Sequence, residues 1–323
     1  MRTSSIVDGD AVEQLLLLAG ALRSGLIDAL AGGEARSVAE VAAAAGADRR
    51  ATGIVLDALA TTGVVERVTE GGVSYRLTPV GKAHLVDEGP RMERSRLLHQ
   101  VNKVRGWLEL PEVIRTGEPA SKGKGPRDIA TRSLAMGERD PDLLEEVVER
   151  CLAYGGTVRT MIDVGGAVGH LARCFSRRGI KATLLDQEAV IPLAREYLGA
   201  DADAIDFITA DYTRSLPAGP FDLVYFGNVY HIYSPETNAR VTREAFSTVS
   251  PGGVIAIQDY ILGRSAQAAM FAVNMLRSTV DGGVWTEEQH REWLRDAGFV
   301  EIEVVDLDSA STQLVLARRP RGL

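Results

Sequence analysis

The second half of the chain alternates regularly between short apolar runs and helical stretches, and this alternation most constrains the fold. It predicts a mostly parallel sheet covered by helices on both faces, a doubly wound α/β domain whose ligand binds beyond the carboxyl ends of the strands. Two last runs, VEIEVVDL and TQLVLARR, predict a hairpin at the sheet edge. The earlier runs are TMIDVGG from Thr160, KATLLD from Lys181, DAIDFITAD from Asp203, FDLVYFGN from Phe221 and GGVIAIQDY from Gly252.

The first part of the chain has a different pattern. An apolar helix is expected over residues 10–30, and Ser37 followed by Glu40 is typical of a capping box that opens a short helix. A second short helix from Asp48 precedes two β-rich runs, VVERV and VSYRL, joined by TEGG. Two short helices and a glycine-turned hairpin predict a winged-helix-like domain, which either binds DNA or mediates dimerisation.

Charge favours dimerisation over DNA binding. The chain of 323 residues carries 36 Lys and Arg against 44 Asp and Glu, a net charge of −8, and its first 100 residues are also slightly acidic. Proteins that bind nucleic acid or anionic membranes normally present a basic face. We therefore expect neither partner. The expected domains are a dimerisation domain at 1–90, a helical linker and acceptor-pocket region at 91–155, and a catalytic domain at 156–323.

The chain shows no sign of export. Its two cysteines, Cys151 and Cys174, make no disulfide framework. The apolar run from Leu15 to Ala19 is too short to span a membrane and follows acidic residues, unlike a signal peptide. We expect a cytoplasmic protein. The histidines are scattered along the chain, so no metal site is expected.

A glycine-containing turn follows the first predicted strand of the second domain. It runs from Asp163 to Gly169, and a helix is expected to begin near His170. Glycine lets the backbone approach a ligand and turn sharply into a helix. A dinucleotide fingerprint starting at Gly165 would require further glycines where Ala167 and His170 stand, so the spacing disfavours NAD.

Acidic residues follow the next two strands. Asp186 ends the second strand about twenty residues after the glycine turn, where a carboxylate can accept both ribose hydroxyls of a nucleoside. Asp211 and Tyr212 follow the third strand, where an acid and an aromatic ring can hold an adenine. Strand-end aspartates often only cap helices, but the three features in order favour a nucleoside-type ligand.

These motifs resemble those of the small-molecule O-methyltransferases, both the plant caffeate and flavonoid enzymes and the bacterial polyketide-tailoring enzymes. The resemblance implies a class I, Rossmann-like methyltransferase domain, S-adenosylmethionine (SAM) as cofactor, S-adenosylhomocysteine (SAH) as product, and a homodimer. The implied cofactor-binding residues lie in these motifs: Gly165, Gly166, Gly169, Asp186, Gln187, Asp211, Tyr212 and Asn228. The motifs themselves read DVGGAVGHLA, DQEAVIPLAREYL, ITADY, LPAGPFDLVYFGNVYHIYSPETN and SPGGVIAIQDYIL.

His231 and Asp259 are the candidate catalytic residues. His231 follows the fourth strand, and a neutral histidine can remove the acceptor's proton at physiological pH. The family's general-base histidine falls on His231, and the acid that orients it falls on Asp259. A carboxylate on one imidazole nitrogen fixes the tautomer. The alternatives are a structural histidine at a helix start and an aspartate that caps a loop.

The chain departs from the family pattern around this pair. The family's His-Asp-Trp is here His231-Ile232-Tyr233, a second acid of the plant enzymes is replaced by Val284, and their lysine by Gly227. These departures leave open methylation of nitrogen or carbon, or a reaction of the bound sulfonium without methyl transfer. A winged-helix ligand-sensing regulator is a further alternative.

The resemblance also implies an acceptor pocket, although Met and aromatic residues at helical spacing are more often core. The leading function is methylation of a hydroxyl on a small, aromatic secondary metabolite of the kind made in antibiotic biosynthesis. Histidines 84, 170 and 290 are expected to be ordinary surface or helix-terminus residues. The expected substrate residues are Met136, Asn274 and Met275, with His99, Trp107, Met270 and Phe271 in the same segments.

Overall fold

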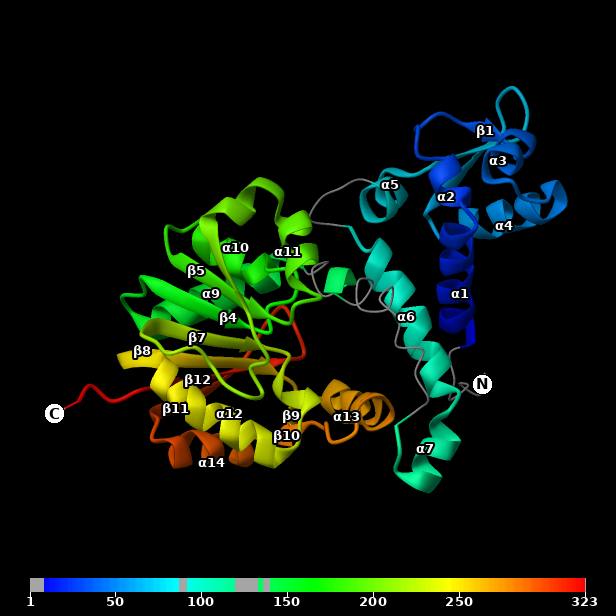
Figure 1. Cartoon of the computed structure of the whole chain (residues 1–323). Coiled ribbons are helices and arrows are strands. Elements are labelled where there is room, and N and C mark those ends of the chain that lie inside the picture. The colour runs from blue at the N-terminus through cyan, green and yellow to red at the C-terminus, as the bar shows by residue number, and fades with distance from the viewer. Residues whose placement is uncertain (1–8, 87–91, 120–132, 136–139, 323) are drawn as a thin grey trace. The chain divides into compact units, whose positions relative to one another are not determined.

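The computed structural model describes residues 9–86, 92–119, 133–135 and 140–322 (Figure 1). The chain divides into two compact units, and the boundary falls after Arg105. The three-part division expected from the sequence stays a prediction. No helix in the described part of the chain is both long and apolar enough to cross a bilayer.

The first unit is built from helices and a small sheet. The expected capping box is present, because Ser37 and Glu40 bond each other's backbone amides. A three-stranded sheet with the order β1-β3-β2 contains the predicted hairpin, while the winged-helix interpretation stays a prediction. The elements are α1 Gly9–Arg23, α2 Leu26–Ala29, β1 Arg36–Ser37, α3 Val38–Ala45, α4 Arg49–Thr61, β2 Val65–Val68, β3 Ser74–Leu77, α5 Pro79–Leu85 and α6 Arg94–Trp107, which crosses the boundary.

The second unit contains a seven-stranded sheet with the order β11-β12-β8-β7-β4-β5-β6. Strands β4 to β8 pair in parallel, and β11 and β12 form the predicted antiparallel hairpin, with β12 against β8. The doubly wound α/β architecture is therefore confirmed. The strands are β4 Thr160–Val164, β5 Lys181–Asp186, β6 Ile205–Thr209, β7 Phe221–Gly227, β8 Val249–Asp259, β11 Val300–Asp306 and β12 Gln313–Arg318.

Both faces of this sheet are buried under helices. Successive side chains along a strand point to opposite faces, so each strand contributes to both cores. In β4, Met161 belongs to the core on one face and Ile162 to the core on the other. Helices α9, α10 and α11 cover the first face, and α12 and α14 the second (Figure 1). The remaining elements of the unit are α7 Leu110–Thr116, α9 Pro141–Gly155, α10 His170–Ser176, α11 Ile191–Leu198, η1 Gly199–Ala204, η2 Tyr230–Ile232, α12 Pro235–Thr248, β9 Ile261–Leu262, α13 Ala266–Ser278, β10 Trp285–Thr286 and α14 Glu287–Ala297.

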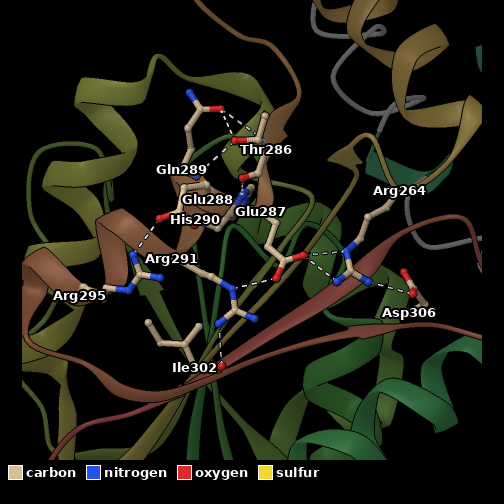
Figure 2. Close-up of polar contacts among 10 residues, drawn as sticks. All are labelled: Arg264, Thr286, Glu287, Glu288, Gln289, His290, Arg291, Arg295, Ile302 and Asp306. Carbon is tan, nitrogen blue, oxygen red and sulfur yellow. Dashed lines mark hydrogen bonds and ion pairs between the residues drawn. The ribbon is translucent and has the colours of Figure 1, made fainter.

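A chain of ion pairs ties α14 to its neighbours (Figure 2). Glu287, the first residue of α14, pairs with Arg264 at 2.6 Å and with Arg291 at 2.8 Å. Arg264 also pairs with Asp306 at the end of β11, and Arg291 donates to the carbonyl of Ile302. These arginines lower the pKa of Glu287 through hydrogen bonds and charge.

His290 lies in the first turn of α14 but is buried in the core, so its expected place at the surface was wrong. Its side chain is 1% exposed, Nδ1 lies 2.9 Å from the carbonyl oxygen of Thr286, and the ring stacks on Tyr230. Burial lowers the pKa of His290. The reason is the amphipathic helix: His290 shares the inward face of α14 with Trp293 and is held among aromatic rings.

Candidate functional site

The glycine turn leaves β4 at its carboxyl end and leads into α10. Gly165 has φ 71° and Gly169 has φ 77°, in the left-handed region that favours glycine. A Cβ on Gly165 would lie 3.0 Å from Cγ2 of Val229, and one on Gly169 would lie 2.5 Å from Cδ1 of Leu184. The turn therefore requires glycine both for its conformation and for close approach of neighbouring residues. Gly166 is also crowded, since its Cβ would lie 2.7 Å from the Asp163 carboxyl carbon.

The structure places Asp186 directly against this turn. One carboxylate oxygen accepts the amide of Ala167 at 2.9 Å, and the other accepts the amide of Gln187 at 2.7 Å. Ala167 is held at φ 51°, a strained value for a residue with a side chain. The carboxylate is buried, whereas Gln187 is exposed beside it. Each carboxylate oxygen can accept more than one hydrogen bond.

Asp211 and Tyr212 follow β6 but face different surroundings. Asp211 is exposed, and one of its oxygens accepts the amide of Thr213 at 3.0 Å and its hydroxyl at 2.6 Å. Tyr212 is buried and lies against Gly165. Its hydroxyl accepts a hydrogen bond from Tyr233 at 3.1 Å. The structure thus brings Tyr212 to the glycine turn and shows Asp211 closing its own local turn.

Asn228 begins the loop after β7. It has φ 59°, and its amide donates to the carbonyl of Gln258 in β8 at 2.8 Å. Asparagine tolerates this left-handed conformation better than most residues with side chains. The next residue, Val229, is the one that touches Gly165. The β7 loop, the glycine turn and Tyr212 therefore meet at the same edge of the sheet.

His231 and Asp259 form a buried hydrogen-bonded pair. Nδ1 of the imidazole lies 2.8 Å from Oδ1 of Asp259, and the backbone amide of His231 donates to Oδ2 at 3.1 Å. A third bond comes from the amide of Tyr260. His231 is 6% exposed and Asp259 is 2% exposed. An ionised carboxylate can only accept, so the bond to Asp259 favours the tautomer with the proton on Nδ1, which in a neutral imidazole leaves a lone pair on Nε2.

Helix α13 covers this pair. The ring of Phe271 packs edge-on against His231 at 4.8 Å between centroids and stacks on Tyr260 at 4.4 Å. The imidazole is thus held by a carboxylate at Nδ1 and by an aromatic ring beside it.

The residues expected to contact the substrate differ in how deeply they are buried. Asn274 and Met275 are both buried on α13. Met270 is 60% exposed, and His99 and Trp107 on α6 are half-buried. Met136 lies outside the described residues.

One buried polar residue on the same helix is not singled out by the sequence pattern. Arg277 is 8% exposed, and its Nη2 donates to Oδ1 of Asn274 at 2.7 Å. The signal that points to it is that Arg277 is the single charged residue in the stretch AQAAMFAVNMLRS.

At two positions where the chain departs from the family pattern, the structure has a buried apolar side chain or a neighbouring ring in close contact. Val284 is buried, and its neighbour Trp285 donates to the carbonyl of Tyr230 at 2.9 Å. At Gly227 a Cβ would lie 2.7 Å from Cε1 of Tyr225, whose ring fills that space. Asp259 is therefore the carboxylate that contacts the His231 ring within the described part of the chain.

Comparison with known proteins agrees with this architecture. Residues 141–300 match the model of the O-methyltransferase domain, and residues 10–87 match that of the O-methyltransferase dimerisation domain. The tetracenomycin polyketide synthesis 8-O-methyltransferase of Streptomyces glaucescens is 26% identical, over 90% of this chain and 89% of that protein.

Two further likenesses extend over nearly the whole chain. The 3-hydroxy-5-methyl-1-naphthoate 3-O-methyltransferase of Streptomyces sahachiroi is 28% identical, over 93% of this chain and 90% of its own. The structure of human N-acetylserotonin methyltransferase in complex with SAM has a TM-score of 0.84 at 23% identity, covering 99% of this chain and all of that one. The chain belongs to the family of SAM-dependent O-methyltransferases that carry an N-terminal dimerisation domain.

Proposed function

We propose that this enzyme methylates a hydroxyl group of a small aromatic acceptor, with SAM as methyl donor and His231 as general base. The observation that carries the proposal is the buried hydrogen bond between His231 and Asp259 at the carboxyl edge of the sheet. The aromatic hydroxyl acceptor is supported by relatives named for a polyketide and a hydroxynaphthoate.

The residues at the end of β4 and β5 fit a nucleoside cofactor. The Gly165 turn is half-buried and close-packed against Val229 and Tyr212, and the Asp186 carboxylate lies beside it. We assign Gly165, Gly166, Gly169, Asp186 and Gln187 to the cofactor. Asp211, Tyr212 and Asn228, from the neighbouring strand ends, complete the proposed set. When bound, SAM supplies an electrophilic methyl group on a positively charged sulfur.

His231 performs the proton transfer. Asp259 holds the proton on Nδ1, so the lone pair of Nε2 faces the acceptor hydroxyl and takes its proton as the oxygen bonds to the methyl carbon. The carbon–sulfur bond of the methyl donor would break as the new bond forms, and its electron pair would stay on sulfur, which becomes the uncharged thioether of SAH. Asp259 then stabilises the imidazolium that has formed. General-base catalysis of this kind contributes roughly 10²- to 10⁴-fold to the rate.

Phe271 helps to position the base. Its ring packs edge-on against His231 and is itself stacked on Tyr260, which limits the imidazole to orientations that keep the bond to Asp259. Alignment of two bound reactants accounts for much of the acceleration in two-substrate reactions. Asn274 and Met275, one helical turn further along α13, are the proposed acceptor contacts, together with Met136.

The enzyme is a homodimer in this proposal. The match of residues 10–87 to a dimerisation domain supports it, and α1 exposes apolar side chains such as Val12 and Leu16. We also infer a cytoplasmic location, since both cysteines are free thiols, as expected in a reducing compartment.

The experiment that tests the function is incubation with SAM carrying a ¹³C-labelled methyl group and a set of phenolic acceptors. We expect SAH to form, and the labelled carbon to show the NMR shift of an aryl methyl ether. A label on nitrogen or carbon would contradict hydroxyl methylation while keeping the cofactor. Turnover of SAM to any product that retains the labelled methyl on sulfur would contradict methyl transfer itself.

A further inference from the structure

Arg277 is a buried cation whose hydrogen-bonding capacity is largely unused. Nη2 donates to Oδ1 of Asn274 at 2.7 Å, while Nε is fully buried and has no hydrogen-bond partner. Nη1 makes no hydrogen bond with any described residue. A guanidinium has five N–H donors, and leaving the Nε donor unpaired away from water is costly.

Gly106 makes room for this guanidinium. It is the first residue of the second unit, and a Cβ built on it would lie 2.1 Å from Nη1 of Arg277. Gly106 stands inside helix α6 with an ordinary backbone conformation, where alanine would favour the helix more. The chain therefore gives up helix stability at a position where a methyl group would displace the arginine.

The charge of Arg277 is not neutralised by a contact within the described part of the chain. No carboxylate there lies within ion-pair distance, and Glu109 acts only through longer-range attraction. Burial lowers the pKa of the guanidinium, and Glu109 opposes that shift. If packing alone were required, an apolar residue of similar volume would fill the space without the cost of burying a charge.

Helical spacing relates Arg277 to Phe271, the residue of α13 that contacts the His231 ring. Phe271, which contacts the His231 ring, lies one turn before Asn274, and Asn274 lies one turn before Arg277. Asn274 therefore sits between the two on α13 and is bonded to the guanidinium. The rise from Phe271 to Arg277 is about 9 Å along the helix axis, a distance that a ring system and the arginine side chain can span.

We propose that Arg277, oriented by Asn274 and accommodated by Gly106, determines acceptor specificity by binding a carboxylate on the aromatic ring, remote from the methylated hydroxyl. The inference rests on the proposed function. A carboxylate supplies the negative charge and the paired acceptor oxygens that a guanidinium fork binds best. Asn274 acts by fixing Nη2, which leaves the other edge of the fork for the acceptor.

The test measures binding of acid and ester pairs to the SAH-loaded protein. The probes are hydroxybenzoates and hydroxynaphthoates, each compared with its own methyl ester, which keeps the hydroxyl and the ring but removes the charge. We expect at least one acid to bind about 10- to 100-fold tighter than its ester, the usual gain from charge-assisted hydrogen bonds. If none of the acids binds more tightly than its own ester, the proposal is overturned, whatever the variants show.

Three substitutions locate the effect. Arg277→Met should abolish the preference for the acid and leave ester affinity unchanged, and Arg277→Lys should restore only part of it because lysine lacks the fork. Gly106→Ala should also reduce the preference, although it leaves the arginine in place. Arg243→Met, at an exposed arginine on α12, is the matched control and should keep the full preference. SAH affinity and thermal unfolding identify variants that fail to fold.

Methyl transfer, followed as SAH formation from SAM, separates this inference from the proposed function. Methylation of esters and acids with equal efficiency, together with equal binding, would overturn the role of Arg277 and leave the O-methyltransferase assignment intact. Preferential binding of the acid that is lost in Arg277→Met, without methylation of any hydroxyl, would support the carboxylate site and contradict the proposed reaction.

Discussion

Strands β5 and β8 both end in a buried aspartate, and these two strand ends use the same backbone arrangement for different chemistry. Asp186 accepts the amide of the next residue, Gln187, and the amide of Ala167 in the loop after β4. Asp259 likewise accepts the amide of the residue that follows it and the amide of His231 in the loop after β7. In each case a carboxylate holds the loop that follows a neighbouring strand.

The difference lies in what the held loop offers. At β5 the loop residue is Ala167, so Asp186 holds a backbone amide there and no side chain, and we propose a ligand as its further partner. At β8 the loop residue is a histidine, whose imidazole takes a further bond from Asp259 at 2.8 Å. The same carboxylate device can therefore bind a ligand at one strand end and orient a side chain at the other. If so, substitutions at the two ends should affect different measurements.

Replacing His231 should give the largest effect. His231→Ala removes the proposed base, so we expect turnover to fall by roughly 10²- to 10⁴-fold with SAH affinity unchanged. Turnover is measured as SAH formation and affinity by calorimetric titration with SAH, with NAD as the control ligand. Undiminished turnover would remove the assignment of His231 as base. Loss of SAH affinity would show that the loop after β7 also contributes to cofactor binding, so that the two strand ends do not act independently.

Asp259→Asn should have the next largest effect, again on turnover. The amide no longer fixes the imidazole tautomer or stabilises its charged form, so we expect a decrease of about 10²-fold at saturating SAM. Because the buried amide also faces backbone donors, thermal unfolding must be compared with wild type. A folded variant with wild-type turnover would reduce Asp259 to a cap on the loop after β7.

Asp186→Asn should show the opposite pattern to the first two. We expect SAH affinity to fall by about 10-fold or more, since the proposed charged acceptor of the ribose hydroxyls is replaced by a neutral one. Turnover at saturating SAM should remain close to wild type because the base is intact. A decrease in turnover with unchanged SAH affinity would exchange the roles assigned to the two aspartates.

The smallest effect is expected away from both strand ends, at the ion pairs of Glu287 (Figure 2). The arginines lower the pKa of this carboxyl in the folded state, so its contribution is present above the unfolded pKa and is lost as pH falls through the folded value. Glu287→Gln should lower the free energy of unfolding by about 0.5–1 kcal/mol at neutral pH, because these groups are partly exposed.

Denaturant titrations of Glu287→Gln and wild type at several pH values measure this difference. It should shrink as the pH falls below 4.5, the ordinary value for the carboxyl. Turnover and SAH affinity should both stay unchanged, which makes this variant the control for the three substitutions above. A difference that grows in acid would contradict the assigned sign.

Local patterns in the sequence predicted most of the fold and the members of both strand ends. The runs that end at Asp186 and Asp259 were recognisable as strands because apolar residues are followed there by an acid. His290 was misplaced, because a polar residue inside an amphipathic helix is expected to face solvent. Its burial depends on the aromatic rings that reach it from elsewhere in the chain. Arg277 was not singled out for the same reason, since a charged residue within a helix is also expected to face solvent.

The sequence by itself determined which residues end each strand and which turns require glycine, since side-chain periodicity and backbone conformation are local properties. Only the tertiary structure decided which strand ends are neighbours. Asp259 meets a histidine 28 residues earlier because β7 and β8 pair in parallel, and Asp186 meets the glycine turn because β5 pairs with β4. Pairing between distant segments follows from how the whole sheet and its helices pack, and no local pattern encodes it.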